Sequence, residues 1–149
     1  MTTIQPLHIL LAEDNQDHAD LVIETLQEYN VANHIDHVKA GDDVFRFLDR
    51  IAPFDALPDK GLPDIILLDI KMPRMNGREV LAKLKQETRW KKIPVIMVTT
   101  SANPTEINEC FALGASSYLT KPIKFNEFAQ KIRDLNFYWV MITELPKYL

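Results

Sequence analysis

The chain has 149 residues, a formal net charge of -4 and 46% hydrophobic residues, and it is long enough to bury the core of one domain. The acidic balance argues against a nucleic-acid surface, and no apolar run reaches the roughly 18 residues of a membrane-spanning helix. The start of the chain has no basic leader, and the only cysteine, Cys110, rules out a disulfide within the chain. We therefore predict a soluble, cytoplasmic protein with a single domain over residues 1–149.

The first predicted element is a strand over residues 7–12, an apolar run that ends in the acidic pair Glu13 and Asp14. A helical pattern follows from residue 16 or 17 to residue 29, with its apolar positions on one face. The acids at the amino end of this helix favour it. This pattern predicts a strand and a helix with a carboxylate pair between them.

The next predicted strand is short, near residues 35–38. After it Gly41 turns the chain, and Asp42 is placed to cap a second helix. Residues 52–63 contain three prolines and a glycine, which predicts a surface loop.

The third predicted strand, residues 65–68, lies between two prolines and is apolar throughout, which is typical of a central parallel strand covered on both faces. It delivers Asp69 to its carboxyl end, where open α/β sheets place their ligand sites. A helix follows Asn76 and Gly77 and carries apolar residues on one side.

A fourth apolar run, residues 93–98, ends in Thr99, and a fifth, residues 117–120, ends in Lys121. Between them Asn103 and Pro104 are typical of a helix cap and first turn. This helix carries Cys110, for which we predict burial rather than a redox role. A last helix begins around Asn126, and its apolar pattern extends to residue 142.

Strands and helices thus alternate about five times, which predicts an α/β fold with a doubly wound, five-stranded parallel sheet flanked by helices. Glu13, Asp14 and Asp69 would meet at one edge of this sheet, where a hard divalent cation such as Mg²⁺ would compensate their charge. With the hydroxyl of Thr99 and the ammonium of Lys121, these are the parts of a phosphoryl-transfer site. The four histidines, His8, His18, His34 and His37, have no ligand spacing and are predicted to be packing or surface residues.

With these motifs, and with Met72-Pro73, Asn76-Gly77 and Lys121-Pro122, the chain resembles the receiver domain of two-component response regulators over about residues 7–140. The resemblance implies a CheY-like, flavodoxin-like (βα)5 fold with an extended C-terminal helix and a tail over residues 141–149, without an output domain. Receivers of this kind are signalling proteins rather than enzymes in the usual sense, since they catalyse only their own phosphorylation and dephosphorylation.

The resemblance also implies a role for each site residue. Asp69 would be the phosphoacceptor, and Lys121 would bind the phosphoryl group after a cis peptide bond to Pro122. Asp14 and Asp69 would hold Mg²⁺ directly, Glu13 would do so through water, and the backbone carbonyl of Lys71 would complete the protein ligands. Thr99 would be the switch hydroxyl, and Tyr118 the aromatic side chain coupled to it.

Two enzyme classes are disfavoured by single features of the sequence. A haloacid-dehalogenase-like phosphohydrolase needs a second aspartate two residues after the nucleophile, where this chain has Lys71. Dinucleotide binding needs a glycine-rich first turn, and the chain has four glycines in all. A pseudo-receiver, which would act as an interaction module without phosphorylation, stays as the alternative.

Among receivers, the chain most resembles stand-alone regulators of bacterial, particularly cyanobacterial, phytochromes. This likeness rests on residues 76–81, on the proline-rich loop before Asp64 and on the aromatic residues 137–139. It implies a sensor histidine kinase as partner, a histidine phosphotransfer protein as a further candidate, and a homodimer built on the last helix and the neighbouring strand.

Overall fold

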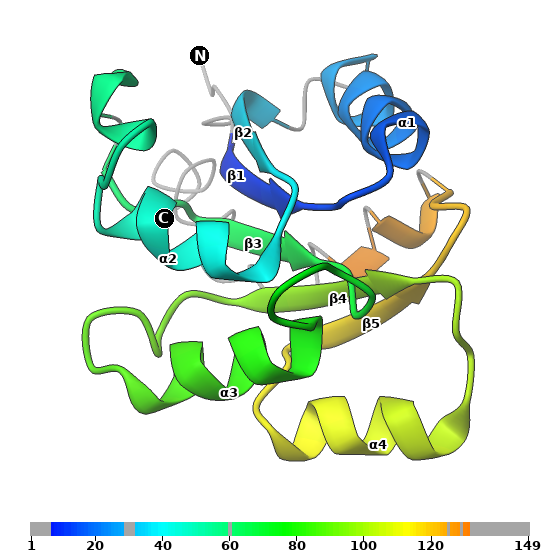
Figure 1. Cartoon of the computed structure of the whole chain (residues 1–149). Helices are drawn as coiled ribbons and strands as arrows, with labels where there is room; N and C mark the ends of the chain where they lie inside the picture. Colours follow the sequence, from blue (N-terminus) through cyan, green and yellow to red (C-terminus); the bar gives the residue numbers. More distant parts are fainter. Residues whose placement is uncertain (1–6, 29–31, 60, 125, 129, 132–149) are drawn as a thin grey trace, which may run out of the picture.

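The computed structural model describes residues 7–28, 32–59, 61–124, 126–128, 130 and 131. Five parallel strands form one sheet in the order β2-β1-β3-β4-β5 (Figure 1). The strands are β1 (Leu7–Ala12), β2 (Ala32–Val38), β3 (Ile65–Leu68), β4 (Val95–Thr99) and β5 (Ser117–Thr120). The parallel sheet that the sequence predicted is therefore confirmed.

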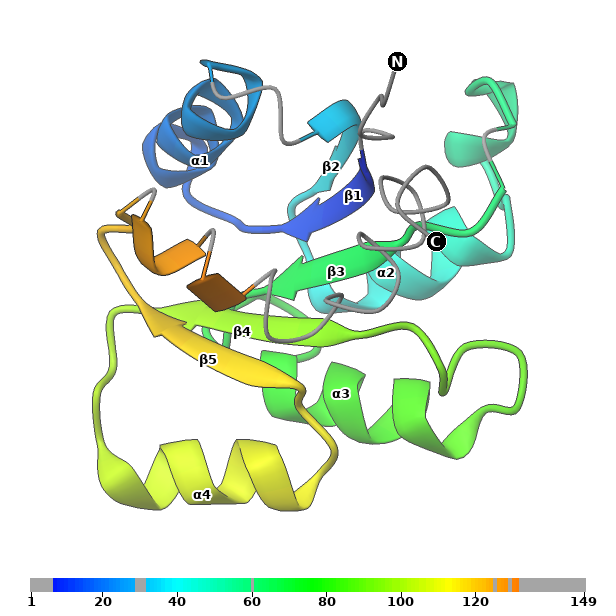
Figure 2. The same ribbon diagram turned by 180° about the vertical axis from the view of Figure 1, so that it is seen from behind.

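The helices cover both faces of this sheet. They are α1 (Gln16–Glu28), α2 (Gly41–Leu48), α3 (Gly77–Gln86) and α4 (Pro104–Ala112), with a 3-10 turn, η1 (Phe54–Ala56). Figures 1 and 2 show α1 on one side of the sheet and α3 and α4 on the other. Residues 126–128, 130 and 131 are also helical, at the predicted start of the last helix, whose remaining predicted positions lie outside the described residues. Within the described part of the chain, no helix combines the length and apolar character needed to span a bilayer.

Two apolar cores result, one on each face, and β3 contributes to both. Ile66 and Leu68 belong to the core beneath α2, α3 and α4, whereas Ile65 and Leu67 belong to the core beneath α1. All four side chains are fully buried. Because successive residues of a strand point to opposite faces, this is the burial expected of a central strand, and it confirms the prediction.

The strand β2 is longer than predicted, because it pairs with β1 along its whole length, from Ala32 to Val38. The full length of β2 was not evident from the sequence, because its first half contains polar residues. An edge strand tolerates such side chains, and β2 lies at the edge of the sheet. The predicted loop over residues 52–63 is mostly exposed, as expected, although it contains the turn η1.

The predicted role of Asp42 as a helix cap is wrong. The N-cap of α2 is Ala40, without a side-chain cap, and Asp42 lies in the first turn, where both its carboxylate oxygens accept hydrogen bonds from Arg74 Nε at 2.8 Å. Gly41 serves a close approach: a Cβ there would lie 1.8 Å from the carbonyl oxygen of Met75. The glycine therefore lets α2 pack against the loop that follows β3.

The starts of α3 and α4 agree with the sequence. Asn76 caps α3 by accepting hydrogen bonds from the backbone N–H groups of Arg78 and Glu79, and the Glu79 side chain accepts one in return, which forms a capping box. Asn103 caps α4, with Pro104 in the first turn. Cys110, on this helix, is fully buried as predicted.

Candidate functional site

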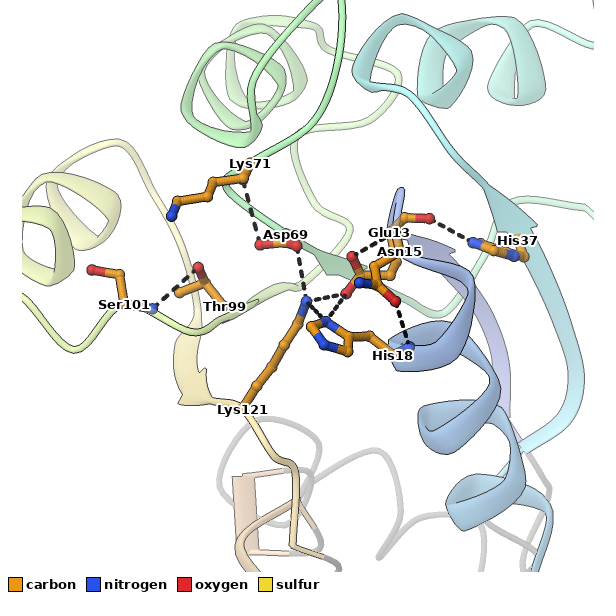
Figure 3. A network of polar contacts seen from close by, with 9 residues as sticks. All are labelled: Glu13, Asn15, His18, His37, Asp69, Lys71, Thr99, Ser101 and Lys121. Atoms are coloured by element: carbon orange, nitrogen blue, oxygen red, sulfur yellow. Dashed lines mark hydrogen bonds and ion pairs between the residues drawn. The ribbon is translucent and has the colours of Figure 1, made fainter.

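The carboxyl edge of the sheet gathers the polar residues that the sequence placed at strand ends. Glu13 and Asp14 follow β1, Asp69 follows β3, Thr99 closes β4 and Lys121 follows β5. The site therefore draws on four of the five strands, with Glu13, Asp69, Thr99 and Lys121 drawn together in Figure 3.

Backbone hydrogen bonds past the strand ends hold these residues in place. The N–H of Asp69 donates to the carbonyl oxygen of Ala12 at 3.1 Å, and the N–H of Lys121 donates to the carbonyl oxygen of Thr99 at 2.7 Å. Because these bonds continue the sheet ladder, the functional side chains start from a rigid backbone rather than from a free loop.

Three carboxylates converge at this edge. One carboxylate oxygen from each of Glu13, Asp14 and Asp69 lies within 4.8 Å of the other two. Glu13 and Asp69 are buried, whereas Asp14 is exposed. Burial, reinforced by the negative charge of Asp69, raises the pKa of Glu13 to about 7, against the opposing hydrogen bond from Lys121.

Lys121 supplies the positive charge inside this group of acids. Its side chain is 8% exposed, and its Nζ lies 2.9 Å from Oδ2 of Asp69 and also donates to Oε1 of Glu13. Its third contact is Nδ1 of His18, at 3.1 Å. The peptide bond between Lys121 and Pro122 is cis, as the resemblance implied.

The donor set fits a hard divalent cation. Three carboxylates offer oxygen ligands, and Mg²⁺ prefers a few carboxylate oxygens together with water and phosphate. Two of the acids already share the single ammonium of Lys121, which shows that the site balances excess negative charge with a cation. Lys71 lies beside the acids: its N–H faces Oδ1 of Asp69 at 3.4 Å, and its side chain is exposed and extends away from Lys121 in Figure 3.

Thr99 and Tyr118 lie next to this charged group. Thr99 is 1% exposed, and its hydroxyl oxygen faces the N–H of Ser101 at 3.4 Å. Tyr118 is buried in the core beneath α3 and α4, and its hydroxyl donates to the carbonyl oxygen of Ser101 at 2.8 Å. The segment after β4 thus contacts both side chains.

Three further residues contact this group, and two of them, His18 and His37, are histidines that the sequence predicted to be packing or surface residues. His18 contacts Lys121, Asn15 accepts a hydrogen bond from the N–H of His18, and His37 lies with Nε2 2.7 Å from the carbonyl oxygen of Glu13. The position of His18 in the first turn of α1, just after the acidic pair, was a usable signal, since that turn faces the carboxyl edge. His37 gave no such signal, because it comes from a neighbouring strand.

A model of the response regulator receiver domain matches residues 9–133. The chain belongs to this family. Its members are signalling domains. The fold, the family and the signalling class predicted from the sequence are therefore confirmed.

Several relatives of this receiver resemble it over nearly its whole length. Response regulator Rcp1 of Synechocystis is 31% identical over 141 residues, which cover 95% of this chain and 94% of that protein. A structure titled as the Mn(2+)-bound form of Rcp1 matches with a TM-score of 0.71, covering 91% of this receiver and 95% of that chain at 31% identity.

Two further structures extend the likeness. The phosphorylated cyanobacterial phytochrome response regulator RcpA matches with a TM-score of 0.73 at 30% identity, covering 91% of this receiver and 94% of that chain. The bacteriophytochrome response regulator RtBRR matches with a TM-score of 0.78 at 34% identity, covering 88% and 78%. The receiver is thus similar to response regulators of phytochromes.

Proposed function

We propose that this receiver accepts a phosphoryl group on Asp69 from a phosphohistidine of a sensor histidine kinase, with Mg²⁺ bound at the acidic edge. The observation that carries the proposal is the position of the Lys121 ammonium, in contact with both Asp69 and Glu13 inside a group of three carboxylates. An acceptor carboxylate, a cation and oxygen ligands for a metal are the parts that phosphoryl transfer needs.

In this reaction a carboxylate oxygen of Asp69 attacks phosphorus, so that an O–P bond forms while the N–P bond to the donor imidazole breaks. The electron pair returns to the imidazole nitrogen, which then takes up a proton. Lys121 turns from the free carboxylate to a phosphoryl oxygen, a contact that a compact ammonium makes well. Asp14, Asp69, Glu13 through water and the carbonyl of Lys71 would hold Mg²⁺, which supplies charge neutralisation for the phosphoryl oxygens.

The signal would leave the site through Thr99 and Tyr118. Thr99 would move to the phosphoryl group, and the segment around Ser101, which contacts both side chains, would rearrange with it. Phosphorylation is a local change of charge, and such a change biases an element that has two stable arrangements. We propose that partner proteins read this rearrangement.

The relatives support a phytochrome as the kinase, because RcpA and RtBRR are titled as response regulators of phytochromes. A cavity of about 340 Å³ beside Lys121 supports the docking of a partner at this edge. Its walls are largely apolar and include Leu21, which is 60% exposed, Val22 and Ile123. A kinase or a histidine phosphotransfer protein would bind there, in the cytoplasm.

We further propose a homodimer built on the last helix. The support is the amphipathic pattern of residues 128–142 in the sequence, most of which lies outside the described residues. Light scattering on the eluting peak of a size-exclusion column would give the mass directly, and a monomer at all concentrations would contradict this proposal.

The test of phosphorylation is incubation of the purified protein with acetyl phosphate, with and without Mg²⁺, followed by intact mass measurement. The wild type should gain one phosphate only with Mg²⁺, and Asp69→Asn should gain none. Asp64→Asn is the matched control, since Asp64 lies at the other end of β3, and it should behave as the wild type. If the wild type gains no phosphate under any condition, the chain is a pseudo-receiver that acts by binding alone.

A further inference from the structure

A second group of ligand-type side chains lies at the amino end of β1, away from the acidic edge. The strand register pairs His8 of β1 with His34 of β2, and Leu10 with Asp36. Because alternate residues of a strand share a face, His8, His34 and Asp36 all lie on one face of the sheet. This group could not be predicted from the sequence, since its members come from two separate segments of the chain.

The two imidazoles converge on one carboxylate oxygen. Nε2 of His8 and Nε2 of His34 each lie 2.9 Å from Oδ2 of Asp36, and the ring centroids are 5.1 Å apart. All three ligand atoms lie within 4.8 Å of one another. Two histidine nitrogens and a carboxylate oxygen, the ligand types of a transition-metal site, thus lie close together.

The surroundings favour a bound cation. The side chains of His8 and Asp36 are only 10% and 14% exposed, and Phe47 packs edge-on against His8 at 6.4 Å between ring centroids. Among the described residues, the buried Nδ1 of His8 has no hydrogen-bond partner, so their contacts satisfy this ring only in part. His8 and Asp36 also line a cavity of about 180 Å³ beneath the loop that contains Pro58 and Asp59.

This cavity opens the cluster to solvent and offers room for a water ligand. Asp59 also lines this cavity, and its Oδ1 lies 3.9 Å from Nη1 of Arg50. Arg50, which also lines the cavity, has its guanidinium hydrogen-bonded to the carbonyl oxygens of Asp55 and Leu57. The guanidinium of Arg50 is therefore held by hydrogen bonds to the backbone of the loop.

We propose that His8, His34 and Asp36 form a binding site for a divalent cation of the Zn²⁺ class, with water from the cavity as a fourth ligand. Imidazole suits Zn²⁺ and its neighbours in the first transition row, whereas Mg²⁺ prefers oxygen, so the two ends of β1 select different ions. Tetrahedral Zn²⁺ with bonds of about 2.1 Å holds its ligand atoms about 3.4 Å apart. Each nitrogen would move about half an ångström farther from Asp36 Oδ2, and the two nitrogens, which lie within 4.8 Å of each other, would adopt the same spacing.

A bound ion would link β1, which carries His8, to the edge strand β2, which carries His34 and Asp36. The proposal does not rest on the phosphorylation of Asp69, because it uses none of the residues of the acidic edge. The ion would stabilise the folded chain by an amount that rises with the logarithm of its concentration above the dissociation constant, since the unfolded chain has no preformed site.

The test is a Zn²⁺ titration of the full chain, after treatment with a chelator and in the presence of millimolar Mg²⁺ to saturate the acidic edge. Affinity is measured by competition with a chromophoric chelator, stoichiometry by native mass spectrometry, and ligand type by the visible absorption of Co²⁺ in place of Zn²⁺. The variants are His34→Asn and Asp36→Asn, with His37→Asn as the matched control, because His37 lies on the same strand and its ring contacts Glu13 instead. Circular dichroism without metal establishes that each variant is folded.

The proposal expects one Zn²⁺ per chain, binding that is weaker by at least about tenfold in His34→Asn and in Asp36→Asn, and unchanged binding in His37→Asn. If Zn²⁺ binds His34→Asn and Asp36→Asn as tightly as the wild type, the ion lies elsewhere and the proposal is wrong. Absence of stoichiometric Zn²⁺ binding to the wild type would overturn it equally. Should one of the two variants fail to fold, the other decides.

Discussion

Lys121 is the residue on which the charge balance of the acidic edge depends. It carries the one ammonium that contacts both Glu13 and Asp69 among the described residues, and its side chain is almost fully buried. A buried charge group that loses one partner becomes strongly unfavourable, because the remaining charges have neither water nor a counter-ion. The same lysine would compete with the proposed Mg²⁺ for these oxygens.

We therefore predict that Lys121→Ala destabilises the metal-free protein by about 3 kcal/mol. Millimolar Mg²⁺ should recover much of this loss, since the cation replaces the ammonium, and the variant should bind Mg²⁺ more tightly than the wild type does. Urea unfolding with EDTA and with Mg²⁺ measures both effects. The exposed Lys91→Ala is the control and should change little.

Glu13 makes the metal-free protein sensitive to pH. Burial raises the pKa of Glu13 from 4.5 to about 7, so between these values the folded chain keeps a proton that the unfolded chain has lost. Stability falls with rising pH wherever the folded state binds more protons. The contribution of Glu13 to stability therefore decreases from about pH 4.5 to pH 7, and its full cost is present above that range.

We predict that Glu13→Gln flattens this pH dependence and makes the metal-free protein more stable than the wild type at pH 8, by roughly 1–3 kcal/mol. Urea unfolding in EDTA at several pH values between 5 and 8 tests this. A wild-type stability that rises over this range with the same slope in Glu13→Gln would contradict it. In the wild type, Mg²⁺ affinity should also fall as pH drops below 7, because a proton then occupies Glu13.

At the scale of elements, the contact between α3 and the end of β3 positions Asp69, the proposed phosphoacceptor. Gly77 is the first residue of α3, and a Cβ there would lie 2.2 Å from the carbonyl oxygen of Asp69. The N–H of Gly77 donates to the carbonyl oxygen of Ile70 at 2.8 Å. The helix start is thus pressed against the backbone that carries Asp69.

We predict that Gly77→Ala shifts the backbone of Asp69 and slows phosphorylation by acetyl phosphate at least tenfold, since a misplacement of about 1 Å in a reacting group can cost about a hundredfold. Asn76→Ala is the matched control at the adjacent position. It removes the cap of α3 and should cost about 1 kcal/mol in stability while leaving the rate nearly unchanged. Equal rates in Gly77→Ala and Asn76→Ala would show that the close approach does not matter for the chemistry.

At the scale of the whole molecule, the sheet separates two cores that both depend on β3. Leu67 contributes to the core beneath α1, and Leu68 to the core beneath α2, α3 and α4. Both side chains are fully buried. A cavity in either core should therefore weaken the same cooperative unit.

We predict that Leu67→Ala and Leu68→Ala each reduce the free energy of unfolding by about 2–5 kcal/mol. Leu21→Ala, at a leucine that is 60% exposed, should cost less than about 0.5 kcal/mol. Chemical denaturation followed by circular dichroism gives all three values. A large loss for only one of the two core variants would mean that the cores do not unfold together.

The accuracy of the predictions from sequence differs from one element to the next. The ends of β3, the start of α3, the cap Asn103 and the burial of Cys110 were predictable, because each is encoded by neighbouring residues. The length of β2 was not, since an edge strand made of polar residues has no distinctive pattern. Asp42 was misjudged because its partner, Arg74, comes from a distant loop.

The alternation of strands and helices and the residue type at each strand end are legible in the sequence, since periodicity and strand termini are local properties of a chain. The strand order, the sharing of Lys121 between Glu13 and Asp69, and the meeting of His8, His34 and Asp36 became known from the folded chain. These features join segments far apart in the chain, and which segments become neighbours depends on sheet order and register. A one-residue shift in register would turn every side chain of a strand to the other face, so both proposed ion sites depend on the assembled sheet.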